Sequence, residues 1–435
     1  MRKVLVCLLT LALVLGCMSV QAEGVLTPGT YTSTMTAMHG PMTVEVTVTD
    51  SAITSVEVVD QVETPGVTDP VFEKIPAAIV DNQTTAVDTI TGATVSSRVL
   101  IAAVQDCLKQ AGDTEGVFSK ELEKAPAEDV TLSADVIIVG GGGAGLAAAV
   151  SASDEGASVI VIEKTGFLGG NSIVAGGIYN APDPELQDYA EISGDQDSLV
   201  EAALAEEPVS EEHAELQDAV RLEFEAYQKT DKTLFDSANW FALQTWNGGD
   251  KIADLDLVKV LTAGAYPALE WLESMGVVWT LMDSLYYGQT EYRMLNAEGN
   301  GAGMTSKMID HLNSLENVTV MLETTGTGLI TNQENEVIGA TAEGKDGSMV
   351  IYADNVVLAT SGFAANKEML EKYIPEIVDA YPMVAPGATG EGILWGMELG
   401  AAVENMHAYQ GYGFYCEGVG AMDQGLADRG GIMVN

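Results

Sequence analysis

The sequence predicts an α/β protein whose main domain is a Rossmann-like parallel sheet, with helical stretches later in the chain and a small α+β domain ahead of it. Two observations support this prediction. From Asp135 to Lys164, an apolar strand, a glycine-rich turn, an Ala-rich helix and a second apolar strand follow in the order of a β–α–β unit. From Gly29 to Val59, polar and apolar residues alternate instead, as they do in half-buried strands.

The glycine-rich turn has the spacing of a dinucleotide-binding loop. Gly140 permits a tight turn, Gly142 lets the backbone approach a pyrophosphate, and Gly145 lets the helix pack closely against the strand. The free N–H groups of the helix then face the phosphates. Glu163, 18 residues beyond Gly145, stands where an acid accepts hydrogen bonds from a ribose diol. The alternative is a plain glycine-rich loop, but the complete order of elements favours a dinucleotide. The contacts expected from this unit are Gly140, Gly142, Gly143, Ala144, Gly145, Glu163 and Lys164.

The N-terminus has the composition of a targeting segment. Arg2 and Lys3 precede the apolar run Val4–Leu15, and Val20–Ala22 supplies small residues for cleavage. We therefore expect residues 1–22 to be a signal peptide. Cys17 could instead accept a lipid as a lipoprotein. Either process predicts an extracytoplasmic protein that is secreted, on the cell surface or periplasmic.

Composition argues against several other classes. The formal charge of −45 over 435 residues repels nucleic acid. Outside the leader the cysteines are Cys107 and Cys416, and no CxxCH or CxxC pattern occurs, so haem and iron–sulfur sites are not expected. The four histidines are scattered, and we predict no metal site.

A second motif lies ahead of the dinucleotide unit. Asp88 to Ser97 reads DTITGATVSS and is followed by an amphipathic helix predicted over Arg98–Gln110. Thr94 stands just before that helix, where a phosphate's negative charge is favoured. The alternative is that Thr94 or Ser96 serves only as a helix N-cap.

This stretch resembles the small FMN-binding domain in which a DxxTGATxxS motif carries covalent FMN. The resemblance gives a domain over residues 23–112, followed by a linker over 113–133 that is rich in Lys, Glu and Ala. It implies that a dedicated flavin transferase attaches FMN to Thr94 as a phosphoester. The other motif residues that it assigns to the FMN site are Asp88, Thr91 and Gly92.

The remainder of the chain resembles the fumarate reductase/succinate dehydrogenase flavoprotein family, in its flavocytochrome-c and urocanate-reductase branch. The motifs that carry this resemblance are Gly140–Gly145 with Glu163, Gly169–Ser172, Ala175–Gly177, Val357–Phe363, Thr389–Gly392 and Gly430–Asn435.

The resemblance implies an FAD-binding domain over 134–181 and 304–435, with noncovalent FAD lying across the sheet. A mainly helical capping domain over 182–303 would close on the flavin. Within it, Leu255–Met275 is expected to form two helices, packed partly by Leu257 and Leu261. Further FAD contacts are expected from Gly170, Asn171, Ser172, Gly176, Gly177, Thr360, Ser361, Gly362, Gly390 and Gly392.

The chemistry implied by the resemblance is reduction of the C=C bond of a small unsaturated carboxylate such as fumarate, urocanate or an acrylate. Reduced FAD delivers hydride from N5 while an acid protonates the neighbouring carbon. Electrons would come from an external donor and pass through FMN, as a terminal step of anaerobic respiration in a membrane-associated system.

The resemblance supplies only part of a catalytic site within this sequence. The family's proton-donor arginine is expected beyond Asn435, as if the chain were a fragment of a longer protein. An HRPxGG-like stretch of the family is replaced by Asn296–Gly301. The catalytic candidates that remain are Tyr412, Asp428 and Arg429.

Purely structural roles are the alternatives to these assignments. Tyr412 could pack in an aromatic cluster, while Arg293 and Arg429 could either touch substrate or have structural roles. Two alternatives for the whole protein stay open: an FAD-dependent dehydrogenase of the 3-oxosteroid type, and a non-catalytic FMN electron carrier. Flavin content separates the carrier from the reductase, which requires two flavins.

Overall fold

The computed structural model describes residues 25–121, 129–184, 196–282, 291–345 and 347–411, and the short strands β13 (Tyr415–Cys416) and β14 (Gly420–Ala421). The chain divides into two compact units. The first comprises Met1–Glu63, Val71–Thr89 and Thr94–Lys124, and the second comprises Thr64–Pro70, Ile90–Ala93 and Ala125–Asn435.

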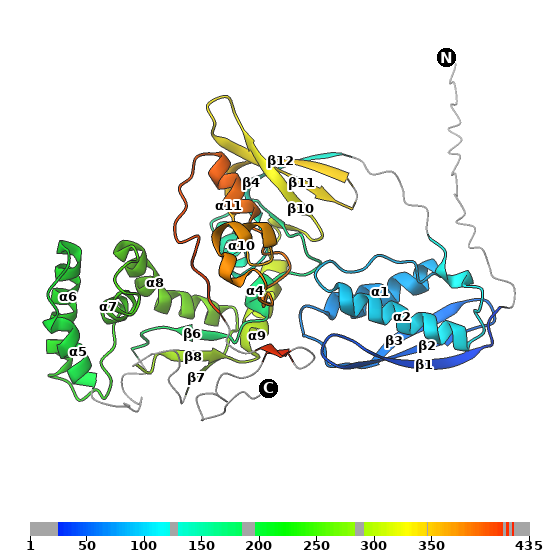
Figure 1. The fold of residues 1–435 in the computed structure, drawn as a ribbon, viewed down its shortest axis with the longest axis horizontal. Coiled ribbons are helices and arrows are strands. Elements are labelled where there is room, and N and C mark those ends of the chain that lie inside the picture. The colour runs from blue at the N-terminus through cyan, green and yellow to red at the C-terminus, as the bar shows by residue number, and fades with distance from the viewer. Residues whose placement is uncertain are drawn as a thin grey trace, which may run out of the picture. The chain divides into compact units, whose positions relative to one another are not determined.

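The first unit is an antiparallel sheet of order β1-β2-β3 with two helices on one face (Figure 1). On β2, Met42, Val44 and Val46 are fully buried and alternate with partly exposed residues, as the sequence pattern predicts. The elements are β1 (Gly29–Thr36), β2 (Pro41–Val48), β3 (Ile53–Asp60), α1 (Asp69–Asn82), α2 (Thr94–Gln110) and the 3₁₀ turn η1 (Val117–Ser119).

Helix α2 is longer than predicted, because it begins at Thr94 and not at Arg98. Its first turn packs into the domain: Ser96 and Ser97 are buried, and the Ser96 hydroxyl donates to the buried carboxylate of Glu63. Burial of this turn outweighs the modest helix propensity of Thr, Val and Ser. Ser96 is therefore not the helix N-cap.

Both ends of the predicted linker, residues 113–133, are structured. Asp113 accepts hydrogen bonds from the backbone N–H groups of Val117 and Phe118, and the Phe118 ring is buried in the first unit. At the other end, strand β4 already begins at Val130. The composition of the stretch did not reveal the hydrogen bonds to Asp113 or the early start of the strand.

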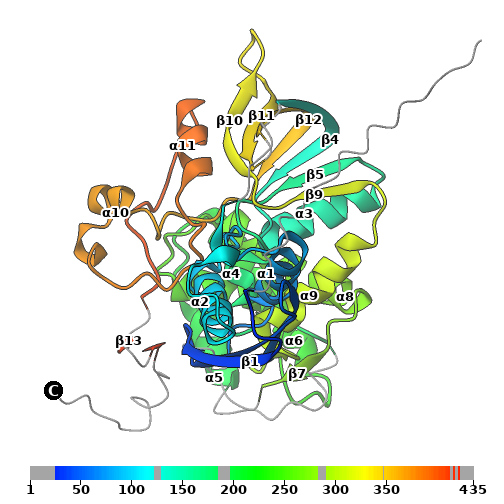
Figure 2. The same ribbon diagram turned by 90° about the vertical axis from the view of Figure 1, so that its right-hand side faces the viewer.

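The second unit contains a six-stranded sheet of order β10-β11-β12-β4-β5-β9 (Figure 2). Strands β12, β4, β5 and β9 run parallel, while β10, β11 and β12 pair antiparallel. The strands are β4 (Val130–Val139), β5 (Val159–Ile162), β9 (Val318–Met321), β10 (Thr325–Thr331), β11 (Val337–Gly344) and β12 (Gly347–Leu358).

Residues of β4 point alternately to two apolar clusters. Ile138 packs with Leu146 of α3 (Gly143–Asp154) and Met308 of α9 (Asn300–Asn313), while Ile137 and Val139 join the other cluster. Figure 2 shows α3 beside β5 and β9, and α9 beyond α3. Burial on both faces explains why this strand is a continuous apolar run. The smaller elements are α4 (Gly170–Ile173), α10 (Lys367–Tyr373), η3 (Pro375–Ile377) and α11 (Glu391–Glu398).

The inserted region is mainly helical, as expected, and also contains a sheet of order β6-β8-β7. Side-chain oxygens of Ser210, Ser237 and Asp254 cap its last three helices. Its elements are α5 (Gln196–Ala205), α6 (Glu211–Tyr227), α7 (Ala238–Gly248), α8 (Leu255–Ser274), β7 (Trp279–Leu281) and β8 (Met294–Ala297), and β8 pairs with β6 (Ile178–Asn180), which lies just ahead of the region.

Helix α8 corrects one expectation, since a single helix replaces the two predicted and contains Pro267. Its buried stripe runs through Leu255, Val258, Thr262, Ala265, Leu269 and Leu272. Leu257 and Leu261 lie outside the stripe and are 68% and 62% exposed. A helix presents one stripe to its neighbours, so apolar residues off that register stay in water.

Among the described helices, none is long and apolar enough to cross a membrane. Within the same residues, no group of three or more His, Cys, Asp or Glu side chains could hold a metal ion.

Candidate functional site

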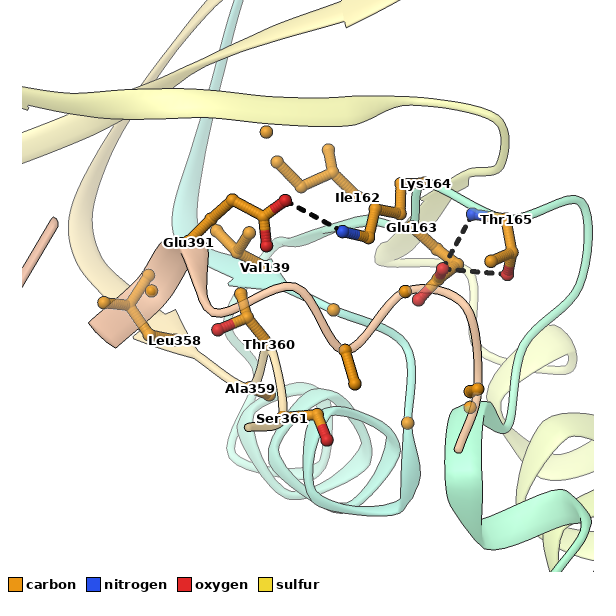
Figure 3. A pocket seen from close by; sticks show the side chains of 18 of the residues that line it. Val139, Ile162, Glu163, Lys164, Thr165, Leu358, Ala359, Thr360, Ser361 and Glu391 are labelled. Atoms are coloured by element: carbon orange, nitrogen blue, oxygen red, sulfur yellow. Dashed lines mark hydrogen bonds and ion pairs between the residues drawn. The ribbon is translucent and has the colours of Figure 1, made fainter. Parts of the chain in front are cut away.

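A cavity of about 560 Å³ opens at the carboxyl ends of β4, β5 and β12 (Figure 3). Ligands of open parallel sheets bind at this edge, and the volume is within the range of small-molecule sites. The sequence-predicted residues that line the cavity are Gly140, Gly142, Gly143, Ala144, Glu163, Lys164, Gly170, Asn171, Ser172, Thr360, Ser361 and Gly392.

The glycine loop has the conformation that its spacing predicts. Gly140 has a φ of 103°, which favours glycine. A Cβ on Gly145 would lie 1.9 Å from the Gly140 carbonyl oxygen, so the helix can approach only because position 145 is glycine. A Cβ on Gly142 would meet no atom within 4 Å, and no side chain caps α3 there. The N-terminus of α3 is thus open to an anion from the cavity.

Glu163 follows β5, is buried, and holds the glycine loop. Its Oε2 accepts a hydrogen bond of 2.7 Å from the Gly141 backbone N–H, and its Oε1 accepts one of 2.8 Å from that of Thr165. The side chain lines the cavity at the predicted place. Sequence reasoning missed Thr165, whose hydroxyl also contacts Glu163, because nothing in its local pattern sets it apart.

Lys164 pairs with a residue from a distant segment. Its Nζ lies 3.0 Å from Glu391 Oε1, an ion pair marked by a dashed line in Figure 3, and the Thr389 hydroxyl donates to the same oxygen at 2.6 Å. Burial alone would raise the pKa of Glu391, but hydrogen bonds from Thr389 and Lys164 outweigh it and hold that pKa below its usual value. Sequence reasoning noted the glycines around Glu391 and not its charge.

Five predicted contacts do not line this cavity: Gly145, Gly176, Gly177, Gly362 and Gly390. Gly145 and Gly177 serve packing, since a Cβ on Gly177 would lie 2.4 Å from the carbonyl carbon of Asn300 at the start of α9. Gly390 has a φ of 85° and begins α11. The motif patterns alone do not separate glycines that face a ligand from glycines required for packing.

In the first unit, Thr94 is the first residue of α2 and its side chain is partly exposed. Asp88 belongs to the same unit, while Thr91 and Gly92 lie in the segment Ile90–Ala93 of the second. Gly92 has a φ of 92°, so the turn of the motif requires glycine. The catalytic candidates Tyr412, Asp428 and Arg429 lie outside the described residues.

Arg293 has a structural role and does not face the cavity. It is 1% exposed and forms two hydrogen bonds to Asp236, of 2.9 Å from Nε and 2.7 Å from Nη2. The guanidinium also stacks 4.4 Å over the Phe241 ring. A buried arginine with a paired carboxylate is a core element, which resolves the alternative left open by the sequence.

Beside this pair, Glu291 is fully buried and accepts a hydrogen bond of 2.9 Å from Trp240 Nε1, with a further bond from Gln196. Burial raises the pKa of Glu291 to about 7. Sequence reasoning missed this residue, since only the fold brings Trp240 and Gln196 to it.

The comparisons with known proteins agree with both parts of the chain. Residues 38–109 match the FMN-binding domain, and residues 135–234 and 222–435 match an FAD binding domain. NADH:acrylate oxidoreductase of Vibrio harveyi is 32% identical over 405 residues, which are 87% of this chain and 40% of that protein. Urocanate reductase of Eggerthella lenta is 31% identical over 389 residues, which are 88% of this chain and 57% of that protein.

A solved structure, the open conformation of a flavocytochrome c3 fumarate reductase, matches 62% of this chain and 41% of that chain, with 27% identity and a TM-score of 0.47. This chain spans 40% of the length of the acrylate oxidoreductase and 57% of the length of the urocanate reductase. The FAD match covers well over half of the chain. This chain therefore belongs to the FAD-binding flavoprotein family that includes urocanate and fumarate reductases, and it carries an FMN-binding domain ahead of the FAD-binding domain.

Proposed function

We propose that this chain is the flavin-bearing part of a reductase that saturates the C=C bond of a small unsaturated carboxylate. The observation that carries the proposal is the pairing of two flavin-binding domains on one chain, the second with a cavity at the carboxyl edge of its sheet. Relatives that align with 87% and 88% of this chain are named for acrylate and urocanate, which share a carboxylate conjugated to a C=C bond.

The residues around the cavity fit a flavin dinucleotide. The open N-terminus of α3, reached past Gly142, suits a pyrophosphate. Glu163 holds the loop at Gly141 in place, and Lys164 places a cation at the cavity wall. When bound, FAD supplies hydride chemistry to the substrate carbon, and the protein supplies position and charge.

The first domain would hold FMN through Thr94. In the attachment step, the Thr94 oxygen forms a bond to the phosphorus of an activated flavin donor, and the bond from that phosphorus to its leaving group breaks. The hydroxyl proton passes to a base of the flavin transferase. The start of α2 favours the resulting phosphate charge, and the partly exposed Thr94 leaves room for a transferase.

The two flavins would work in series, with FMN accepting electrons from an external donor and FAD passing them to the substrate. The basic and apolar leader supports export, so we place this reaction outside the cytoplasm. A respiratory role at the membrane surface is consistent with that location. Cell fractionation tests it, since activity confined to the cytoplasm would contradict export.

The decisive experiment expresses the complete gene product with a flavin transferase and measures flavin content and turnover. We expect two flavins, one of which stays on denatured protein. We also expect reduced methyl viologen to be oxidised when acrylate, urocanate or fumarate is added. FMN as the only flavin, with no turnover, would support the electron carrier. Dehydrogenation of a 3-oxosteroid would support the dehydrogenase, and either outcome would contradict the reductase.

A further inference from the structure

Ser361 has a backbone conformation that is rare for serine, at the wall of the FAD cavity. It lies just beyond the end of β12, and Figure 3 shows it beside Ala359 and Thr360. Its φ is 65°, in the left-handed region that non-glycine residues seldom adopt. A Cβ added to the next residue, Gly362, would meet no atom within 4 Å. The chain therefore carries a side chain at Ser361, where the backbone is strained, and none at Gly362, where there is space for one. Strain of this kind often marks a functional position.

The Ser361 hydroxyl is the end of a directional chain of hydrogen bonds. The Ala385 backbone N–H can only donate, and it lies 2.5 Å from Asn171 Oδ1. This contact determines the orientation of the Asn171 amide, whose Nδ2 then donates to Ser361 Oγ at 3.1 Å. Since Ser361 Oγ accepts from Asn171, its own proton is available to an acceptor in the cavity.

The chain of bonds holds one end of Ala385–Thr389, which we call the closing segment. Ala385, Gly387 and Ala388 of this segment line the cavity. The other end is held through its backbone carbonyls, because the Ala388 carbonyl accepts from the Ala365 N–H at 2.9 Å and the Thr389 carbonyl accepts from Asn366 Nδ2 at 2.9 Å. At Ala385, the backbone N–H is held by a side chain, that of Asn171.

We propose that Ser361 is a positioning residue that couples FAD binding to the closing segment. Its strained backbone places the hydroxyl so that it receives the Asn171 amide and donates its proton to an oxygen of the bound dinucleotide. The oxygen acceptor completes the hydrogen-bond chain, so bound FAD and the ordered closing segment stabilise each other. The inference rests on FAD occupying this cavity.

The test compares wild type, Ser361→Ala and Ser361→Gly in the full chain loaded with FAD. Both variants lose the hydroxyl. We expect FAD to dissociate about 5–30-fold faster from each, because one good hydrogen bond to it is lost. Release is followed by the recovery of flavin fluorescence. Ser306→Ala, which removes a hydroxyl bonded within α9, is the matched control and should release FAD at the wild-type rate.

Two further readouts separate positioning from a general loss of stability. Ser361→Gly relieves the positive φ, so its FAD-free form should melt at or above the wild-type temperature although it releases FAD faster. Hydrogen exchange of the peptide containing Ala385 should slow when wild type binds FAD. That protection should be lost in both variants and kept in the Ser306→Ala control.

The outcomes are distinguishable. A wild-type chain that binds no FAD would contradict the assignment of the cavity itself. FAD release at the wild-type rate from the Ser361→Gly variant, or unchanged protection at Ala385 in that variant, would overturn the role of Ser361 while leaving the FAD site intact. If Ser361→Ala fails to fold, Ser361→Gly alone still decides, because glycine tolerates the conformation.

Discussion

Lys164 and Glu391 are 227 residues apart in the chain and meet across the cavity wall, with 3.0 Å between Nζ and Oε1. Lys164 follows β5, and Glu391 begins α11. The pair therefore joins the dinucleotide unit to a segment from the far end of the described chain. It also neutralises a carboxylate that lines the cavity.

Removing Lys164 should weaken FAD binding. In Lys164→Met, Glu391 keeps its charge beside the cavity without its partner, and we expect the FAD dissociation constant to rise about tenfold. Equilibrium titration monitored by flavin fluorescence measures this. Lys345→Met, an exposed lysine away from the cavity, is the control. Equal FAD affinities for the two variants would contradict a role for Lys164 in FAD binding.

Glu291 should make the protein less stable as pH rises. Its pKa in the folded state is raised from 4.5 to about 7, so the folded state keeps a proton that the unfolded state has already released. Stability from this group is complete below pH 4.5 and is lost as pH rises to about 7, a change of about 3 kcal/mol.

Urea unfolding of the full chain between pH 4.5 and 8 measures this slope. Glu291→Gln removes the titration and keeps hydrogen-bonding capacity, so we expect a flatter profile. Glu298→Gln, at an exposed position, should keep the wild-type slope. An equally steep profile in Glu291→Gln would show that another group causes the pH dependence.

Thr94→Ala should abolish the flavin fluorescence that remains on denatured protein, because the hydroxyl that accepts the phosphate is gone. Ser96→Ala should retain it, since the Ser96 hydroxyl is already bonded to buried Glu63. In-gel fluorescence after co-expression with a flavin transferase measures both. Flavin persisting on Thr94→Ala would refute the attachment site.

Substitutions at two glycines of one loop should affect FAD binding and protein stability separately. Gly142→Val places methyl groups in open cavity space at a φ of −73°, so the FAD-free protein should keep its melting temperature while FAD affinity falls at least about thirtyfold. Gly145→Ala places a Cβ 1.9 Å from the Gly140 oxygen, and should cost about 1–3 kcal/mol of stability.

Melting curves of the FAD-free variants and titration with FAD distinguish the two effects. If Gly142→Val melts much earlier than wild type, the loop is less open than the structure shows. If Gly145→Ala melts like wild type, the close contact of α3 with the loop is relieved by a small shift.

The elements that the sequence predicted well are those whose residues are contiguous. From Gly140 to Glu163, the turn, the helix and the acid after β5 occur where local spacing places them. Predictions failed where tertiary packing determined the start of a helix or the face that it buries. The first turn of α2 is helical because it is buried against Glu63, and Leu257 and Leu261 are exposed because α8 buries another stripe.

The sequence by itself determined the β–α–β unit, the FMN motif and the part of the cavity wall that the glycine loop forms, because backbone requirements at glycines and strand ends are local. Only the tertiary structure decided the partners of ionisable side chains. Lys164 with Glu391, Arg293 with Asp236, and Glu291 with Trp240 each join segments distant in the chain. A charge buried at such a meeting point is stable only with a partner, and the fold determines which partner arrives.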